Sequence, residues 1–178
     1  MVRSFLGSVA TIVLLCAAAG MILTLGFLPT TARSVPPRFE RQVATQALNA
    51  SIHRHAPYIA NPYSVDDQSL IAGMKIYTMN CAVCHGALDA QSSALEHSFY
   101  PPAPQLIVKP VNDPEWRTFY IVRTGVRFTG MPAWERILSE QDMWKVTAFL
   151  SRIENLPPSV VSYWHEVYAP KPESSPRR

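Results

Sequence analysis

Two cysteines and a histidine stand together in the segment CAVCH, which runs from Cys81 to His85. A C-x-x-C pair can form half of a structural zinc site, a dithiol redox switch, or the attachment point of a covalently bound haem. A structural zinc site needs four ligands, and the only further cysteine, Cys16, lies in an apolar stretch. A thioredoxin-like dithiol needs a strand before the motif, whereas the residues before Cys81 have helical spacing. The histidine after Cys84 therefore favours the haem interpretation, with His85 as an axial ligand of the iron.

An iron bound by His85 takes a second axial ligand or keeps an open position. Met131 lies 46 residues further along, between Gly130 and Pro132, and completes no apolar helix face. Glycine permits a close backbone approach, and proline fixes the direction of the chain after the loop. We therefore expect Met131 to be the second ligand. Three other methionines lie in predicted helices, and they are Met74, Met79 and Met143. The alternatives to Met131 as the second iron ligand are His97 and His165.

Four segments have the sequence pattern of helices, and they are residues 38–56, 65–81, 114–125 and 140–153. Ser64 is expected to cap the second of these helices and Ser139 to cap the fourth. The apolar residues of the second helix recur at helical spacing up to Cys81, so this helix runs into the motif. No run of residues predicts a strand with confidence. The expected fold class is therefore all-α, a small domain that wraps around one cofactor.

The N-terminal region is dominated by residues 5–28, which carry no charge. A run of this length suffices to span a bilayer as a helix, so residues 1–28 are predicted to be a transmembrane anchor. The alternative is a cleaved signal peptide, with Arg3 before the apolar run and a small-residue cleavage site after it. The remaining predicted parts are a linker with a short helix (29–63), a domain (64–156) and a partly disordered C-terminal extension (157–178).

The chain has a formal net charge of +3, but the charge is unevenly distributed. Residues 64–170 contain 8 basic and 11 acidic residues. No basic patch interleaved with aromatic residues occurs there, so nucleic acid is not expected as a partner. A carrier steered by electrostatics through solution shows a strongly charged docking face, and this domain has only the lysines Lys75, Lys109 and Lys145. A tethered or permanently bound protein is the better interpretation.

Four segments of the chain, GMKIYTMNCAVCHG, YPPAPQL, TGMPAW and DMWKVTAFL, resemble the successive signatures of class I cytochromes c. The similarity covers residues 64–156 and points to the bacterial monohaem group, which includes cytochrome domains of terminal oxidases and dehydrogenases. It implies one covalently bound haem c, with thioether bonds to Cys81 and Cys84. It also implies that the N-terminal helix crosses the C-terminal helix. The expected contact residues are Gly73, Tyr77, Trp144 and Phe149.

The same resemblance implies a set of residues around the haem. Pro102 or Pro104 would hold the backbone near the axial histidine, and Leu106 would pack on the haem ring. Basic and aromatic residues flank the methionine loop, and one of them would donate hydrogen bonds to the haem propionates. The residues expected in this role are Arg123, Arg127 and Trp134.

An iron bound by histidine and methionine has no free position, so the resemblance implies a one-electron carrier rather than an enzyme. We expect a membrane-tethered carrier, or a subunit of a respiratory or photosynthetic electron-transport complex, with other redox proteins or subunits as partners. Membrane lipid would surround the anchor. Because haem attachment is completed outside the bacterial inner membrane, the domain is expected in the periplasm. The alternatives are a mainly structural or assembly subunit and an open-site haem sensor or enzyme.

Overall fold

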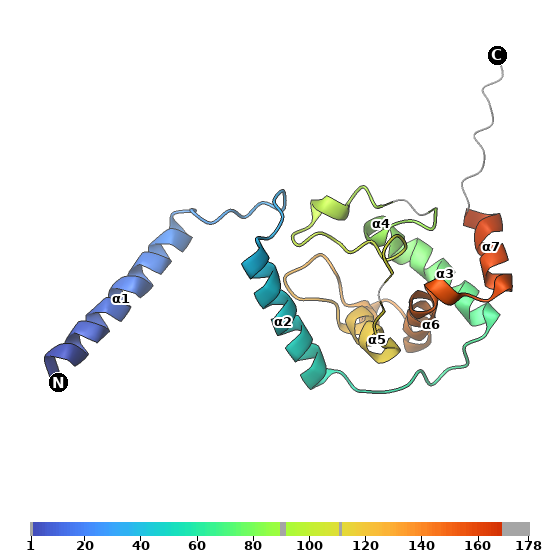
Figure 1. The fold of residues 1–178 in the computed structure, drawn as a ribbon, viewed down its shortest axis with the longest axis horizontal. Coiled ribbons are helices and arrows are strands. Elements are labelled where there is room, and N and C mark those ends of the chain that lie inside the picture. The colour runs from blue at the N-terminus through green and yellow to red at the C-terminus, as the bar shows by residue number, and fades with distance from the viewer. Residues whose placement is uncertain (1, 90–91, 111, 169–178) are drawn as a thin grey trace, which may run out of the picture. The chain divides into compact units, whose positions relative to one another are not determined.

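The computed structural model describes residues 2–89, 92–110 and 112–168 (Figure 1). Its internal contacts divide the chain into two units, Met1–Thr31 and Ala32–Arg178. The described residues form helices and loops without any strand, which confirms the all-α fold class. The tail 169–178, which belongs to the extension expected to be partly disordered, lies outside the described residues.

The first unit consists mainly of helix α1 (Val2–Thr24). Within it, Leu6–Thr24 is long and apolar enough to cross a membrane, and its large apolar side chains are exposed. The hydroxyl groups of Thr11 and Thr24 donate to the carbonyl oxygens of Gly7 and Gly20 one turn earlier. These polar groups are therefore satisfied within the helix, as a hydrocarbon environment requires.

The second unit contains the remaining helices, several of them very short. They are α2 (Arg38–His55), α3 (Asp67–Asn80), α4 (Ala82–His85), α5 (Glu115–Thr124), α6 (Glu140–Ser151) and α7 (Pro158–Tyr168). Three 3₁₀ turns complete the unit: η1 (Glu96–Ser98), η2 (Trp134–Arg136) and η3 (Ile153–Asn155). The four helices expected from the sequence are all present. The stretch between α4 and α5 is a long loop, as its prolines predicted.

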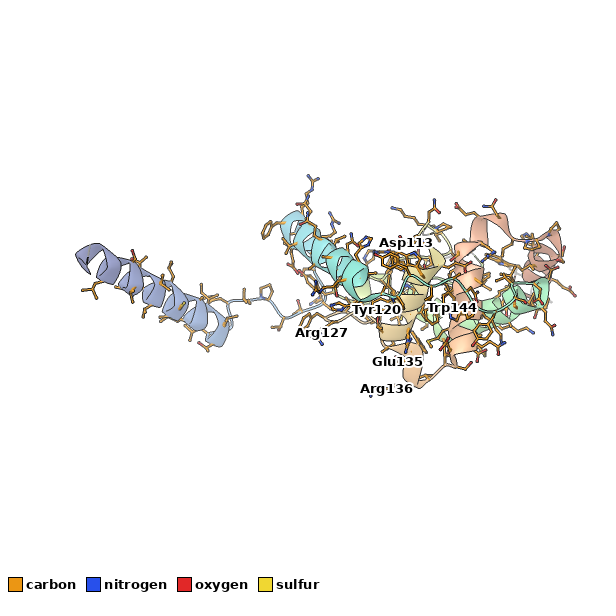
Figure 2. All side chains as sticks on the ribbon, turned by 90° about the horizontal axis from the view of Figure 1, so that it is seen from below. Asp113, Tyr120, Arg127, Glu135, Arg136 and Trp144 are labelled. Carbon is orange, nitrogen blue, oxygen red and sulfur yellow. The ribbon has the colours of Figure 1, made fainter. Side chains whose placement is uncertain are left out.

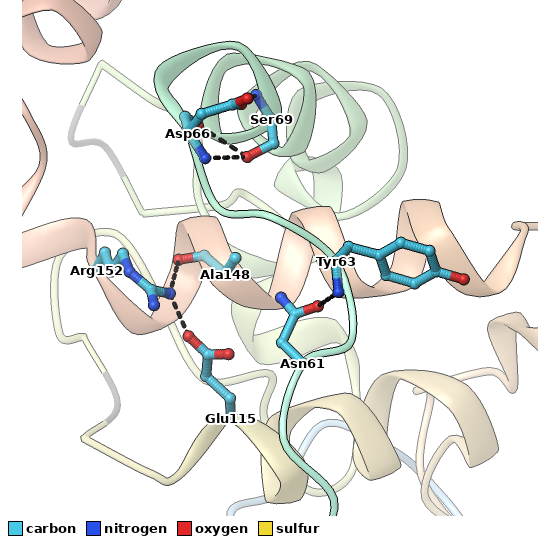
Figure 3. A network of polar contacts seen from close by, with 7 residues as sticks. All are labelled: Asn61, Tyr63, Asp66, Ser69, Glu115, Ala148 and Arg152. Carbon is cyan, nitrogen blue, oxygen red and sulfur yellow. Dashed lines mark hydrogen bonds and ion pairs between the residues drawn. The ribbon is translucent and has the colours of Figure 1, made fainter.

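Helix α3 begins later than the sequence analysis expected. Asp66, not Ser64, is the N-cap residue, and its carboxylate accepts a hydrogen bond from the Ser69 backbone amide at 2.7 Å. The Ser69 hydroxyl accepts in return from the Asp66 backbone amide at 2.9 Å, which completes a capping box (Figure 3). Asp66 and Asp67 follow Val65. Asp66 is the cap because its carboxylate reaches the backbone amide of Ser69, the third residue of the helix. For α6 the expected cap is confirmed, because the Ser139 hydroxyl accepts from the Asp142 amide at 3.1 Å.

The core of the unit forms where α3 crosses α6. A Cβ atom on Gly73 would lie 2.1 Å from the carbonyl oxygen of Lys145 and 3.0 Å from the Cβ atom of Phe149. Only a glycine therefore allows the two backbones to come this close. The rings of Tyr77 and Phe149 pack at 5.9 Å between centroids. The expected helix crossing is thus confirmed at Gly73, Tyr77 and Phe149.

Helix α5 packs against α6 from another direction. Phe119 of α5 stacks on Trp144 of α6, with ring centroids 3.9 Å apart and an interplanar angle of 7°. The guanidinium of Arg152 pairs with the Glu115 carboxylate and also donates to the Ala148 carbonyl (Figure 3). Trp144, which the resemblance placed against α3, therefore has its stacking partner in α5.

Helix α7 was not anticipated, since the sequence analysis treated residues 157–178 as an extension. Val160 has no exposed surface, and the Trp164 indole Nε1 donates to the Leu88 carbonyl oxygen at 2.7 Å. Trp164 also packs on Phe149, with ring centroids 6.0 Å apart. This part of the chain consequently belongs to the folded unit.

Candidate haem site

A cavity of about 310 Å³, lined mainly by apolar side chains, lies in the second unit. This volume is within the range of small-molecule and cofactor sites. Eight of the ten residues expected around the haem line it, and they are Cys81, Cys84, His85, Pro102, Pro104, Leu106, Met131 and Trp134. Three segments that are distant in sequence therefore meet at one place. They are the C-x-x-C-H motif (81–85), the proline loop (99–106) and the methionine loop (125–134).

One of the two exceptions is Arg127, whose side chain is exposed and is not among the cavity-lining residues (Figure 2). Arg123 does not line the cavity either, and its Nε donates to the Glu135 carboxylate at 3.1 Å. The alternative iron ligands His97 and His165 are exposed and also lie outside the cavity lining. Of the residues proposed for the propionates, only Trp134 reaches the cavity.

The backbone of the C-x-x-C-H motif is held in place by Tyr77. Its buried hydroxyl group donates to the carbonyl oxygens of His85 at 3.0 Å and Gly86 at 2.7 Å. Burial, with a smaller contribution from Cys81, raises the pKa of Tyr77, so the hydroxyl keeps the proton that it donates. Gly86, with a φ of 93°, ends the single turn of α4. The position of the motif thus depends on the helix that precedes it.

The imidazole of His85 is oriented by the proline loop. Its Nδ1 lies 2.8 Å from the carbonyl oxygen of Pro104, and because a carbonyl only accepts, Nδ1 is the protonated nitrogen. Nε2 is left with the lone pair that an iron ligand needs. The Leu106 amide donates to the His85 carbonyl at 2.9 Å and ties the same two segments together. Of the two prolines named in the sequence analysis, Pro104 is the one whose carbonyl oxygen contacts His85.

Gln105 is a structural residue of the site that the sequence analysis missed. It is 8% exposed, and its Nε2 donates to the carbonyl oxygens of Cys84 at 3.0 Å and Ala103 at 2.9 Å. Its Oε1 accepts from the Ser93 amide at 2.7 Å. A glutamine inside a proline-rich loop carries no signal of burial in the sequence. Its three bonds fix the motif, the 92–98 segment and the proline loop relative to one another.

The surroundings of Cys81 favour neither a zinc site nor a reactive dithiol. Burial, with a smaller contribution from the neighbouring Cys84, raises the pKa of the Cys81 thiol to about 12. A zinc ligand or a reactive dithiol requires a stabilised thiolate, and this environment favours the neutral thiol. Within the described part of the chain, no three His, Cys, Asp or Glu side chains form a group that could bind a metal ion. Both alternatives to the haem interpretation therefore lack geometric support.

Two glycines allow close packing of the Met131 loop, Gly125 at the end of α5 and Gly130 against the Phe99 ring. Gly125 has a φ of 66°, and a Cβ atom there would lie 2.6–2.7 Å from backbone atoms of Met131, Pro132 and Ala133. A Cβ atom on Gly130 would lie 2.4 Å from the Phe99 ring. The Met131 carbonyl accepts from the Val126 amide at 3.1 Å, and its amide donates to the Thr129 hydroxyl at 3.1 Å. The loop is therefore fixed at both of its ends.

Trp134 provides a further test of whether the cavity suits a haem. Its indole Nε1 is buried and has no hydrogen-bond partner among the described residues. A buried donor without a partner is costly and uncommon in a native protein. A haem presents propionate oxygens, which would accept from such a donor. The apolar lining, the oriented imidazole and this unpaired donor all fit a haem.

An all-α domain with a C-x-x-C-H motif and a loop methionine facing one apolar cavity has the architecture of a monohaem cytochrome c. Residues 68–150 match the family described as "Cytochrome C oxidase, cbb3-type, subunit III". This segment of the chain is therefore a c-type cytochrome domain, and the resemblance noted in the sequence is confirmed. A domain of this class binds haem c and serves electron transfer.

No curated protein matches the chain. Among solved structures, the chain is similar to part of the "Kuenenia stuttgartiensis reducing HAO-like protein complex Kustc0457/Kustc0458", with 16% sequence identity and a TM-score of 0.44. The alignment covers 66% of this chain and 61% of that chain.

Proposed function

We propose that this protein is a membrane-tethered one-electron carrier, or a carrier subunit of an electron-transport complex, with a single covalently bound haem c. The cysteines Cys81 and Cys84 would form the thioether bonds, and His85 and Met131 would be the axial ligands. One observation carries the proposal: the motif, the oriented imidazole and the methionine loop line the same apolar cavity.

The two thiols suit the chemistry of haem attachment. Cys81 and Cys84 would each hold the haem by adding a thiol across one vinyl group, with a sulfur–carbon bond in place of the π bond and the thiol hydrogen on the other vinyl carbon. The addition consumes no oxidant or reductant. Both cysteines are free and line the cavity, which supports their assignment to this step.

A bound haem of this kind supplies one-electron exchange between the ferrous and ferric states. The residues of the chain would favour the ferrous state in two ways. The thioether of Met131 is a soft ligand that raises the reduction potential. The apolar lining excludes water and disfavours the additional positive charge of ferric iron. With both axial positions filled by protein, exogenous ligands would find no vacant site.

Tethering is supported by the apolar helix α1 and by the modest charge of the domain. Leu6–Thr24 has the length and composition of a membrane span, and a domain with few lysines lacks the strongly charged face of a diffusing carrier. We infer that α1 stays in the bacterial inner membrane, with the cytochrome domain in the periplasm. The partners would be redox proteins or subunits held in the same membrane.

The test is an absorption spectrum of the full-length protein purified from membranes in detergent, reduced with dithionite, before and after carbon monoxide is added. The wild-type protein is expected to show a c-type spectrum that does not respond to the gas. The variant Met131→Ala should respond, because an axial position becomes free. Met79→Ala is the matched control, since Met79 is 73% exposed and does not line the cavity.

Each outcome distinguishes one of the alternatives. A wild-type spectrum that shifts with carbon monoxide would remove Met131 from the iron and favour a sensor or an enzyme. Normal assembly and turnover of the complex after Cys84→Ala, despite loss of the haem, would favour a structural role. The absence of any haem spectrum from the wild-type protein would overturn the proposal.

A further inference from the structure

Helix α2 lies outside the segment 68–150 that matches the cytochrome family, yet it belongs to the same compact unit (Figure 1). The sequence analysis placed it in a linker. Ile52 is 2% exposed, and Ala56, at the C-terminal end of the helix, is 6% exposed. A helix in a free linker would expose every face to solvent. In α2, Ile52 is instead buried and Leu48 and Asn49 are half-buried, whereas the remaining residues of the helix are exposed.

Polar contacts hold this helix near its beginning and in its C-terminal half. Near the beginning, the Tyr100 hydroxyl donates to the Glu40 carboxylate at 2.8 Å, and this bond raises the pKa of Tyr100. In the C-terminal half, Arg117 of α5 donates through Nη2 to the side-chain oxygen of Asn49 at 2.7 Å. Residues 100 and 117 belong to the proline loop and to α5, and both of these segments line the cavity.

The end of α2 is held by aromatic rings. The ring of Tyr58, just after the helix, packs on Trp116 of α5 with 4.3 Å between centroids. His53 contacts the same pair, since its Nδ1 lies 2.9 Å from the Tyr58 hydroxyl and its ring centroid lies 6.2 Å from that of Trp116. Contacts at the beginning, in the C-terminal half and at the end fix the rotation of α2 about its own axis.

This rotation places Leu48 in the wall of the cavity. Leu48 is four residues before the buried Ile52, so the two side chains share one helix face. The neighbouring Asn49 binds Arg117, whose Nε also lies 3.1 Å from the carboxylate of Asp113, another cavity-lining residue. Arg117 thus links α2 to α5 and forms an ion pair with an acidic residue of the cavity lining.

We propose that α2 is a wall of the haem site, and that Leu48 contacts the haem and excludes water from it. The inference rests on the proposed haem function. The helix that follows the membrane anchor then contributes to the reduction potential, in addition to connecting the anchor with the domain. Asn49 and Arg117 are positioning residues, because they act on the site through Leu48.

The physical consequence concerns the balance between the two oxidation states. Ferric iron carries one more positive charge than ferrous iron, and an apolar wall stabilises that charge less than water or a polar side chain would. Replacement of Leu48 by a polar side chain should therefore favour the ferric state. The reduction potential should fall, although the axial ligands are unchanged.

The experiment is a redox titration of the full-length, haem-loaded protein in detergent, comparing wild type, Leu48→Asn and Val43→Asn. Val43 lies on the same helix, is 49% exposed and does not line the cavity. At a fixed solution potential, we expect Leu48→Asn to lower the ferrous-to-ferric ratio about threefold to tenfold, a tenfold change being about 59 mV for a one-electron couple. Asn49→Ala should shift the ratio in the same direction by less, and Val43→Asn should leave it unchanged.

Hydrogen exchange of the wild-type protein gives a second, mutation-free readout. The amides of α2 should be protected to a degree similar to those of α5, and far more than those of residues 25–37. Exchange of α2 as fast as that linker would overturn the inference. So would a titration in which Leu48→Asn and Val43→Asn match wild type. A wild-type protein without a c-type spectrum would overturn the proposed function instead, so the two failures are distinguishable.

Discussion

The two sides of the cytochrome domain are built on different principles. Where α3 crosses α6, the chain fills its own interior: Tyr77, Trp144 and Phe149 have no exposed surface, and Gly73 lets the backbones touch. On the other side, the proline loop, the methionine loop and α2 surround a cavity of about 310 Å³. Among the described residues, the indole nitrogens of both Trp144 and Trp134 are buried without a hydrogen-bond partner, but only Trp134 lines the cavity. The first side is filled by protein side chains, and the second leaves a cavity that a cofactor would fill.

The largest effect is expected when the cofactor is lost from the cavity side. The double variant Cys81→Ala, Cys84→Ala should abolish covalent haem, which a haem stain of a denaturing gel would detect. Hydrogen exchange should then accelerate most in residues 99–106 and 125–134, because these loops pack against the haem. The amides of α3 and α6 should be affected less. Cys16→Ala, a change in α1, is the control and should retain haem.

An equal acceleration over the whole domain in that experiment would contradict the comparison. It would mean that the helix crossing also depends on the cofactor. The difference in exchange between the loops and the crossing helices, and not the total loss of stability, is therefore the quantity to measure.

Gly73→Ala tests the side that the chain completes by itself. In an ordinary helix interior this change stabilises by roughly 0.5–1 kcal/mol. Here the new methyl group would meet the Lys145 carbonyl oxygen, and overpacking of this kind costs about 3 kcal/mol. We expect a corresponding loss in the free energy of unfolding by urea titration, with an unaltered haem spectrum in the folded state. A gain in stability would show that the helices can separate without cost.

Tyr77→Phe tests the junction between the two sides. The change removes the hydroxyl that donates to the carbonyl oxygens of His85 and Gly86. Loss of a donor to buried carbonyl groups costs about 1–2 kcal/mol. The free energy of unfolding should fall by that amount, while the spectrum stays that of a closed site, because Pro104 still orients the imidazole. If stability is unchanged, the backbone of the motif is held by other contacts.

The smallest effect is expected from pH, at the first turns of the two crossing helices. The Ser69 amide and hydroxyl lower the pKa of Asp66, and Lys145 and Ser139 lower the pKa of Asp142. A carboxylate whose pKa is lowered by folding contributes stability above its ordinary value of 3.8, and this contribution is lost as the pH falls through the folded pKa. The midpoint of urea unfolding should therefore fall in acid.

Asp66→Asn is the matched variant for this pH effect, since asparagine caps a helix well but carries no charge. Its unfolding midpoint should depend less on pH below about 4 than that of the wild-type protein. Identical pH profiles for the two proteins would exclude the Asp66 carboxylate as a source of acid sensitivity.

The local parts of the fold could be predicted from the sequence. Helix α5 lies between Pro114 and Gly125, and Ser139 caps α6, because each of these signals acts within one turn of the chain. The haem motif and Met131 were also identifiable from residue type and spacing alone. Their roles as haem attachment points and iron ligands await the spectroscopic tests.

Prediction from the local sequence was less accurate where two possible helix caps lay close together and where a side chain lay in a loop. Ser64 and Asp66 both have side chains that can cap a helix, and the choice depends on where the backbone turns, which the preceding residues decide. Arg127 lies near Met131 in sequence, yet its side chain is exposed. The direction in which a loop side chain points depends on backbone angles that residue type does not encode. The neighbouring Phe128, with a positive φ of 62°, illustrates this.

By itself, the sequence determined the class of the domain, since C-x-x-C-H and its histidine are adjacent residues whose chemistry needs no long-range contact. Only the tertiary structure decided which distant segments complete the cavity. The contacts that place Leu48, Gln105 and α7 join distant residues, such as Trp164 and Leu88, which are 76 positions apart, and Ser159 and Asp67, which are 92 positions apart. Such contacts leave no periodic pattern in the sequence, because each depends on the packing of whole helices around the cavity.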